Sequence, residues 1–392
     1  MSSQCRFVPA QLIQDGRARR PRVPRINSRE ENALKIFLLI LTMHIDYLTL
    51  MHYNEGVWRY AFMNKPRLSD IARAAGVSTA TVSNALNHKN KVNQEKAEEI
   101  RRLAADMGYF PGAEGRRRSL RFIIYRKHGK VVMDTAFFAQ LIEGVQEECR
   151  RLSCDLLINK VRAGDDVSAL TDMPMLVLAT EMDADDLAPY RTLKHPVLLL
   201  DSDFRFEPFS SVSIDNCEAG YLAGKHLIAH GHRRIGFLDS ALPFNNMADR
   251  FAGLKAALDE AGLACAARVP LEPTVEGAER DMAAWLAGNR QLPTAFFAGN
   301  DIMAIGASMA LKQAGFAIPQ DVSLMGMDDM PVCLVVEPRL STVRVDKQKL
   351  GMIAVDRLIA MMEEDERVYQ RIRVSVSVTG RESVRFLPEN VR

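Results

Sequence analysis

The chain has 392 residues, which is too long for one ordinary domain and suits two or three. Its composition, 47% hydrophobic and 26% charged, is that of a globular protein and excludes the disordered, collagen-like and disulfide-dense classes. The net charge of +2 is unevenly distributed: residues 1–62 carry +4, residues 65–120 carry +5 and residues 121–392 carry −7. A basic segment joined to a larger acidic one predicts a polyanionic partner for the basic segment.

The six cysteines include no Cys-x-x-Cys pair, and their spacing supports neither a zinc ribbon nor a disulfide framework. A reduced, cytoplasmic protein is therefore expected. His226 and His230 have the spacing of a metal pair, but Gly231 ends their helix and no third ligand is fixed nearby, so we expect no metal. The chain contains no phosphate-binding loop, dinucleotide fingerprint or nucleophile elbow. We expect no cofactor and no enzymatic activity.

Residues 1–62 form an extension in which five arginines precede an apolar run at 36–43. This order is similar to a signal peptide, but the run is shorter than the ~20 residues that span a bilayer, and no small-x-small cleavage site follows it. The alternative is that translation starts at Met63, immediately before a compact module. We favour that alternative over a signal or anchor, and expect 1–62 to be disordered or a misassigned start.

Residues 63–110 predict a small helical domain. Apolar residues share one face over 69–75, Gly76 supplies a turn, and Ser78 is a suitable N-cap for a second helix over 79–86. A third helix over 94–107 closes the core. Helix, glycine turn and helix form a helix-turn-helix, whose second helix can enter the major groove of DNA. A polar face is also normal for any three-helix bundle; the surrounding lysines and arginines favour DNA.

The segment from Lys65 through Asp-Ile-Ala and Ala-Gly-Val-Ser-Thr-Ala-Thr-Val-Ser to Asn87 closely resembles the lactose-repressor (LacI/GalR) family, and the resemblance continues over about 330 residues. It implies that Thr79, Ala80 and Asn84 occupy base-reading positions. It implies backbone contacts or caps for four further residues, Ser69, Ser78, Thr81 and Ser83. Asn84 is able to pair with both N6 and N7 of adenine.

The resemblance weakens at residues 111–120, where the family has a hinge helix that wedges a leucine into the minor groove. Here two glycines and three consecutive arginines occupy the segment, and each glycine disfavours a helix by about 1 kcal/mol. Strict register places Arg118 at the wedge, whereas a two-residue shift places Leu120 there. Arg116 and Arg118 are also suited to a narrow minor groove, and a solvated linker is the remaining alternative.

Residues 121–385 predict an α/β domain, with 386–392 as a tail. Short continuous apolar runs alternate with helical patterns, which indicates parallel sheets covered on both faces. We expect strands at 122–125, 156–158, 175–179, 197–200, 235–238, 295–297 and 323–325, and helices at 137–151, 218–230, 248–261, 278–286 and 302–314. Two similar halves suggest the two-lobed periplasmic-binding-protein-like architecture, in which ligands bind between the lobes.

The family resemblance also implies an effector site between the lobes. Its candidate residues are Phe137, Phe138, Asp201, Asn246, Arg250, Phe297, Asn300 and Asp328. Carboxylates and arginine suit the paired hydroxyls of a sugar or a base edge, and the two phenylalanines suit a ring. Ordinary core packing is an equal alternative for Phe137, and a turn for Asp328. For Asp301 we prefer the role of helix N-cap, and we expect 338–343 to be a crossover between lobes.

These features predict a DNA-binding transcription regulator, and we expect it to be a repressor. A small effector, expected to be a sugar, would control it. Double-stranded operator DNA and a second copy of the chain are the expected partners, because paired helix-turn-helix units match a near-palindromic operator. The alternative from another class is a secreted sugar-binding transport protein, which shares the two-lobed fold but leaves the basic helix-turn-helix without a purpose.

Overall fold

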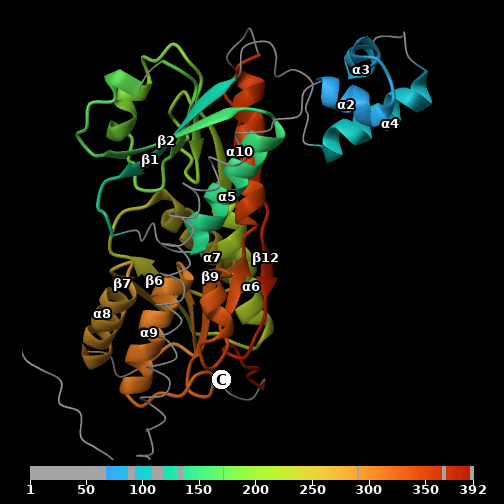
Figure 1. Ribbon diagram of the computed structural model, residues 1–392. Coiled ribbons are helices and arrows are strands. Elements are labelled where there is room, and N and C mark those ends of the chain that lie inside the picture. The colour runs from blue at the N-terminus through green and yellow to red at the C-terminus, as the bar shows by residue number, and fades with distance from the viewer. Residues whose placement is uncertain are drawn as a thin grey trace, which may run out of the picture. The chain divides into compact units, whose positions relative to one another are not determined.

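The computed structural model describes residues 68–86, 93–107, 118–130, 136–170, 172–288, 291–363 and 368–388. The chain divides into two compact units, residues 1–109 and 110–392 (Figure 1). The expected start at Met63, the apolar run at 36–43 and the hinge residue Arg116 lie outside the described residues. Among the helices in the described ranges, none is both long and apolar enough to cross a bilayer.

Within its described residues, the first unit has three helices: α2 (Leu68–Ala75), α3 (Thr79–Leu86) and α4 (Gln94–Asp106). Gly76 makes the turn between α2 and α3 with φ of +65°, a conformation that glycine adopts without strain. The Ser78 hydroxyl accepts a hydrogen bond from the Thr81 backbone N–H (3.1 Å), as an N-cap does. Ile71, Val82 and Ile100, one from each helix, are fully buried and form the core. The predicted helix-turn-helix is confirmed.

The described part of the second unit forms two six-stranded sheets, each with helices packed on it. The first sheet is wholly parallel in the order β11-β5-β4-β3-β1-β2. Its strands are β1 (Ser119–Arg126), β2 (Asp155–Arg162), β3 (Met175–Leu178), β4 (Val197–Leu200), β5 (Ser210–Ile214) and β11 (Arg371–Val374). Helices α5 (Ala136–Arg151) and α10 (Lys347–Met361) lie side by side on this lobe (Figure 1). Short 3₁₀ segments at Ser168–Leu170 and Asp185–Tyr190 complete it.

The second sheet has the order β12-β10-β9-β8-β6-β7 and is parallel except for β12. Its strands are β6 (Ile235–Ser240), β7 (Ala267–Leu271), β8 (Ala295–Ala298), β9 (Ser323–Asp328), β10 (Ser341–Arg344) and β12 (Ser377–Thr379). The helices that pack in this lobe are α6 (Asn216–Ala229), α7 (Asn245–Glu260), α8 (Val275–Gly288) and α9 (Asp301–Gln313), with a 3₁₀ turn at Pro331–Leu334. The predicted two-lobed α/β fold is confirmed.

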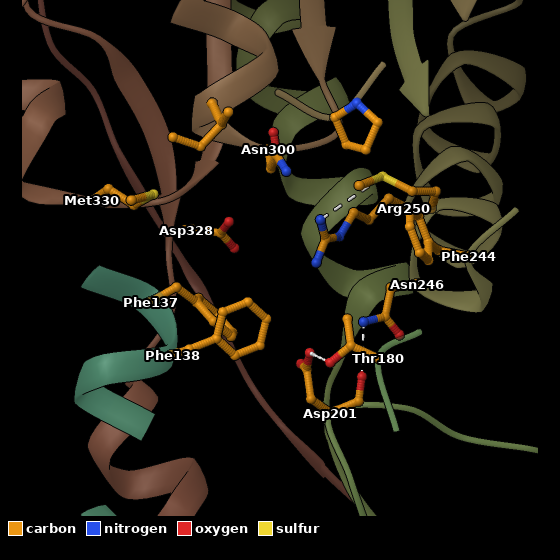
Figure 2. Close-up of a pocket in the computed structure, with 13 residues that line it drawn as sticks. Phe137, Phe138, Thr180, Asp201, Phe244, Asn246, Arg250, Asn300, Asp328 and Met330 are labelled. Carbon is orange, nitrogen blue, oxygen red and sulfur yellow. Dashed lines mark hydrogen bonds between the residues drawn. The ribbon is translucent and has the colours of Figure 1, made fainter. Parts of the chain in front are cut away.

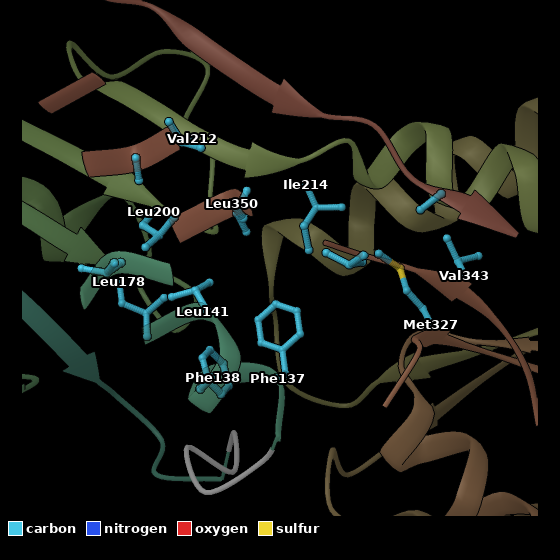
Figure 3. Packing of buried hydrophobic residues seen from close by; sticks show 14 of the residues in the cluster. Phe137, Phe138, Leu141, Leu178, Leu200, Val212, Ile214, Met327, Val343 and Leu350 are labelled. Carbon is cyan, nitrogen blue, oxygen red and sulfur yellow. The ribbon is translucent and has the colours of Figure 1, made fainter. Parts of the chain in front are cut away.

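Apolar side chains from both lobes join in one continuous core. Figure 3 shows Phe137, Leu178 and Leu200 from the first lobe in the same cluster as Met327 and Val343 from the second. Burial of these side chains favours the compact unit through removal of apolar area from water. This hydrophobic core therefore spans both lobes of the second unit.

Two sequence expectations about connections are wrong. Residues 338–343 are not a crossover, because Ser341 opens β10 in the second sheet and the chain crosses only after Arg344. Leu120 cannot be a minor-groove wedge, because it lies in β1 and its side chain is fully buried. Arg118 lies one residue before β1, and its guanidinium pairs with the exposed carboxylate of Glu363. The hydrophobic pattern around Leu120 belongs to the sheet, not to the hinge.

Helices α6 and α7 approach so closely that glycine is required at their contact. A Cβ at Gly220 of α6 would overlap the backbone carbonyl of Arg250 in α7, and a Cβ at Gly253 would overlap the Cys217 carbonyl. Protein interiors have no free space to absorb such an overlap. The position of the α7 backbone at Arg250 is thus fixed by the absence of a side chain on α6.

We expect Gly220→Ala to destabilise the protein by about 2 kcal/mol or more, since overpacking forces the two helices apart. Urea unfolding measures this loss. Gly288→Ala is the matched control, because no atom lies near the added Cβ at this end of α8; there the helix propensity of alanine predicts no loss. Equal stability of Gly220→Ala and wild type would show that α7 moves freely.

Candidate functional site

The second helix of the helix-turn-helix presents polar residues to solvent at its N-terminal end. Ser78, Thr79 and Ala80 are exposed, and Thr81, Ser83 and Asn84 are half-buried, while Val82, Ala85 and Leu86 face the core. Ser69 is exposed on the first turn of α2. A helix with small polar side chains on its free face fits the major groove and brings donors and acceptors to base edges.

A pocket in the second unit collects the ends of several elements (Figure 2). It encloses about 640 Å³ of space, part of it open to solvent, and is lined by Phe137, Phe138, Thr180, Asp201, Phe244, Asn246, Met247, Arg250, Pro273, Asn300, Ile302, Asp328 and Met330. Thr180, Asp201 and Asn300 follow the carboxyl ends of β3, β4 and β8, and Asp328 ends β9. Ligands of parallel α/β sheets bind at this edge.

Seven of the eight residues proposed for the effector site line this pocket, and Phe297 does not. The Phe297 ring is fully buried within β8 and packs against Phe237, with 5.7 Å between ring centroids. Phe297 lies inside β8 (Ala295–Ala298), a central strand whose four residues are all buried, so its side chain faces packed core. The expected effector contact of Phe297 is therefore wrong.

The N-cap assignment at this strand end is also wrong. Asn300 caps α9, since its side-chain oxygen accepts from the Met303 N–H (2.8 Å). Asp301 is the first residue of the helix and is fully buried. Its carboxylate accepts from Thr342 Oγ1 (2.7 Å) and from the Met330 N–H (2.9 Å). Asp301 thus ties α9 to β10 and to the segment that follows β9.

Arg250 is the cationic group of the pocket. It lies in the second turn of α7, which begins at Asn245, so Arg250 does not open its helix and Asn246 is helical rather than in a loop. The Arg250 side chain is buried; Nε donates to Asn216 Oδ1 (2.8 Å) and Nη1 donates to the Gly299 carbonyl. These partners hold the guanidinium so that it points toward Asp328 across the pocket (Figure 2).

Two buried carboxyl groups face this guanidinium. The Thr180 hydroxyl donates to Asp201 Oδ2 (2.8 Å), and the Asn246 side-chain amide donates to the backbone carbonyl of Asp201 (2.8 Å). The Oδ1 atoms of Asp201 and of Asp328 are buried and have no hydrogen-bond partner among the residues that the structure describes. Burial raises the pKa of Asp201 to about 7, against the lowering effects of the Thr180 hydrogen bond and Arg250. Unpartnered buried acceptors are costly, and a ligand with hydroxyl donors would satisfy them.

Phe137 and Phe138 form one wall at the start of α5. Their rings meet edge to face, with centroids 5.0 Å apart, and both are largely buried. Both rings also belong to the continuous core. Core packing and pocket lining were alternatives for Phe137, and the ring does both: it belongs to the hydrophobic core and it also lines the pocket.

Six lining residues were not foreseen: Thr180, Phe244, Met247, Pro273, Ile302 and Met330. Thr180 follows β3 by two residues, as Asp201 directly follows the adjacent β4, and a polar residue just after a strand was a usable signal. The others are apolar residues of loops and first helical turns, where periodicity carries no information. They make the wall around Arg250 more apolar than the sequence suggested.

The histidine pair shows no sign of a metal site. In the described part of the chain, no group of three or more metal-ligating side chains converges. His230 Nδ1 lies 2.7 Å from the His226 carbonyl, and the His230 ring stacks on Phe386 at 4.1 Å between centroids. Burial lowers the pKa of His226 to about 4, and the neighbouring His230 adds to the effect. These contacts assign the pair a role in packing the chain's end onto α6.

The raised pKa of Asp201 predicts a pH-dependent stability of the ligand-free protein. Its carboxyl binds a proton more tightly folded than unfolded, so its contribution is fully present below about pH 4 and is lost as pH rises through about 7. We expect Asp201→Asn to be more stable than wild type by about 2 to 4 kcal/mol near pH 8, and to lose this advantage near pH 4. Urea unfolding across this range is the measurement. The exposed Asp259→Asn change should show no such trend, and a less stable Asp201→Asn protein near pH 8 would contradict the cost of ionising this group.

Comparison with known proteins matches both units. The model of bacterial regulatory proteins of the lacI family matches residues 67–112, and that of the periplasmic binding protein-like domain matches residues 224–384. The HTH-type transcriptional repressor PurR of Escherichia coli O139:H28 is 31% identical over 334 residues, which cover 81% of this chain and 96% of that protein. The ribose operon repressor of Haemophilus influenzae is also 31% identical over 334 residues, covering 81% and 98%.

Solved structures show the same fold. The complex of the transcriptional regulator CelR with cellobiose has a TM-score of 0.61 at 23% identity and covers 81% of this chain and 99% of that one. The Lac repressor dimer bound to operator and the anti-inducer ONPF has a TM-score of 0.59 at 22% identity, covering 82% and 100%. With a helix-turn-helix, a two-lobed α/β unit and full-length relatives that are repressors, the chain is a DNA-binding transcription regulator, and it belongs to the lacI family of bacterial regulatory proteins.

Proposed function

We propose that this regulator represses transcription as a homodimer, that α3 reads operator DNA and that a neutral sugar bound in the pocket changes DNA affinity. The observation that carries the sugar proposal is the pair of unpartnered, buried carboxyl oxygens on Asp201 and Asp328, which face Arg250. Hydroxyl groups on neighbouring carbons donate to carboxylates and accept from a guanidinium, so one polyol satisfies all three groups.

The charge of the pocket favours a neutral ligand over an anionic one. Two carboxyl groups and one guanidinium are the charged side chains among the lining residues, and no cation is left to neutralise a phosphate. A second carboxylate near a bound anion is repulsive in a buried site. Relatives point the same way: one is a ribose operon repressor, and a LacI family regulator from Enterococcus faecium was solved with bound ribose.

The DNA-binding proposal gives base-reading roles to Thr79, Ala80 and Asn84, and backbone-contact or capping roles to Ser69, Ser78, Thr81 and Ser83. The exposure of α3's N-terminal residues supports it. The division into compact units at residues 109 and 110 supports separate domains at 63–110 and 119–385, since β1 begins at Ser119 and not at the expected 121. The segment between them is the proposed hinge, and Arg116 is its proposed minor-groove contact; Arg118, which pairs with Glu363, is not assigned that role. We place the protein in the cytoplasm with its operator, and propose no enzymatic activity.

The DNA proposal is tested by fluorescence anisotropy on DNA from upstream of the protein's own gene, at two salt concentrations. We expect Asn84→Ala to weaken binding to the selected site by about 1–3 kcal/mol and to leave the salt dependence unchanged, because Asn84 reads a base. Arg102→Ala, an exposed cation on α4, should weaken selected and random DNA alike and reduce the salt slope by about one. If wild type binds the selected DNA and random DNA equally, both with and without sugars, the selected DNA does not contain an operator for this protein.

The effector proposal is tested by calorimetric titration with D-ribose, cellobiose and ribose 5-phosphate. We expect a neutral sugar to bind, and Arg250→Lys to weaken it at least about tenfold, because lysine does not reproduce the guanidinium fork. Arg280→Lys, on the exposed face of α8, is the control. The bound sugar should then change operator affinity by about 1–3 kcal/mol. Preference for the phosphate ester would contradict the charge argument.

A further inference from the structure

A buried lysine begins the helix that leads away from the pocket. Lys347 is the first residue of α10 and its side chain is almost wholly buried, whereas Asp346 caps the helix through the Lys349 N–H (3.0 Å). A cation at a helix N-terminus opposes the helix dipole, and lysine is rarely buried without partners. The position of Lys347 therefore has a local cost that its surroundings must offset.

The partners of Lys347 are backbone carbonyls around the end of β9. Its Nζ donates to the carbonyl of Asp328, and lies 3.4 Å from those of Asp329 and Val345. Asp328 and Asp329 have φ of +110° and +50°, two consecutive non-glycine residues in the left-handed region. Such a turn is strained and persists only where the surroundings hold it. The ammonium group holds this turn through its backbone carbonyls.

The turn directs the Asp328 carboxyl into the pocket, where charges from several elements face it. Arg250 of α7 and Lys347 of α10 are the cations, while Asp301 of α9 and Asp201 after β4 are the nearby acids. Burial raises the pKa of Asp328 to about 6, and Arg250 and Lys347 partly offset that rise.

The same turn is held on its other side. The Arg381 guanidinium pairs with the carboxylate of Asp329, which leaves the Asp329 side chain turned away from its neighbour. Within the first lobe, to which α10 belongs, the Lys347 Nζ lies 6.0 Å from the centroid of the Phe137 ring, within the range of a cation–π contact.

We propose that Lys347 is a positioning residue of the effector site: its ammonium group fixes the left-handed turn at Asp328 and keeps the Asp328 carboxylate charged and directed at the ligand. Lys347 thereby links the ligand-facing turn to the first turn of α10 and to the aromatic wall of α5. This inference rests on the proposed sugar-binding function, because only a ligand in the pocket makes the aim of Asp328 matter. Lys347 itself does not line the pocket.

The test separates the charge of Lys347 from its hydrogen bonds by two substitutions in the full-length protein. Lys347→Gln keeps a donor and removes the charge, and Lys347→Met removes both. Lys349→Met is the matched control, since Lys349 is exposed two residues along the same helix. Thermal unfolding confirms that each variant is folded; if Lys347→Met fails to fold, Lys347→Gln still decides the question.

The first readout needs no ligand. The Asp328 carboxyl carbon is followed by ¹³C NMR during a pH titration and is assigned by its loss in Asp328→Asn. We expect the titration midpoint, about 6 in the wild type, to rise by about one unit in Lys347→Gln and to stay unchanged in Lys349→Met. An unchanged midpoint in Lys347→Gln, or an equal rise in Lys349→Met, would overturn the proposal.

The second readout is D-ribose affinity against pH. Lys347→Gln should bind about five- to tenfold more weakly than wild type near pH 6 and recover near pH 8.5, where Asp328 is ionised in both proteins. Lys347→Met should be weaker at every pH, because the turn is no longer held. A merely structural lysine would give pH-independent losses in both variants, and that result refutes the positioning role. If neither D-ribose nor cellobiose binds wild type but the NMR midpoint moves, the sugar proposal fails, whereas the effect of Lys347 on the Asp328 carboxyl is still demonstrated.

Discussion

The arrangement of the second unit depends on one electrostatic constraint: carboxyl groups of Asp201 and Asp328 are buried around a guanidinium that is already shared with uncharged partners. Arg250 donates to Asn216 and to the Gly299 carbonyl, so it only partly compensates the two acids. Among the described protein groups, each acid has one buried oxygen without a hydrogen-bond partner. Burial of two acids with such oxygens has a free-energy cost that the rest of the unit must offset.

That cost is borne by a rigid frame. Gly220 and Gly253 let α6 and α7 touch through their backbones, which fixes Arg250, while the Asn300 cap and the buried Asp301 fix the ends of β8 and β9. Because parallel strands bring their carboxyl ends to the same edge, residues far apart in sequence converge without any local signal between them. The parallel sheets bring these residues to one edge, and the polar residues at the strand ends line the pocket there.

The sequence predicted the features that depend on local pattern. Gly76 and Ser78 marked the helix-turn-helix. Asp201, Asn300 and Asp328 were expected in the pocket from the family resemblance, and their places at or just after strand ends agree with it. The sequence predictions were wrong where tertiary contacts determine the position of a side chain. The burial of Phe297 and Leu120 depends on strand direction and register, and Asn300, not Asp301, is the N-cap of α9. Lys347 gave no signal, since its role arises from the backbone conformation of residues nineteen positions earlier in the chain.

The helix that Lys347 begins offers a contiguous route from the pocket toward the hinge. Helix α10 packs on α5 through Gly144 and Gly351, where any Cβ would overlap the backbone of the partner helix, so little relative movement can be absorbed between them. Beyond its last turn, Glu363 pairs with Arg118, one residue before β1. A change in the Asp328 turn on sugar binding therefore acts on a stiff element whose far end contacts the residue at which the hinge segment meets the sheet. Such an arrangement connects the pocket to the start of the first sheet through three kinds of contact: the Lys347 hydrogen bonds at one end of α10, the close backbone packing of α10 on α5, and the Arg118–Glu363 ion pair beyond the last turn of α10.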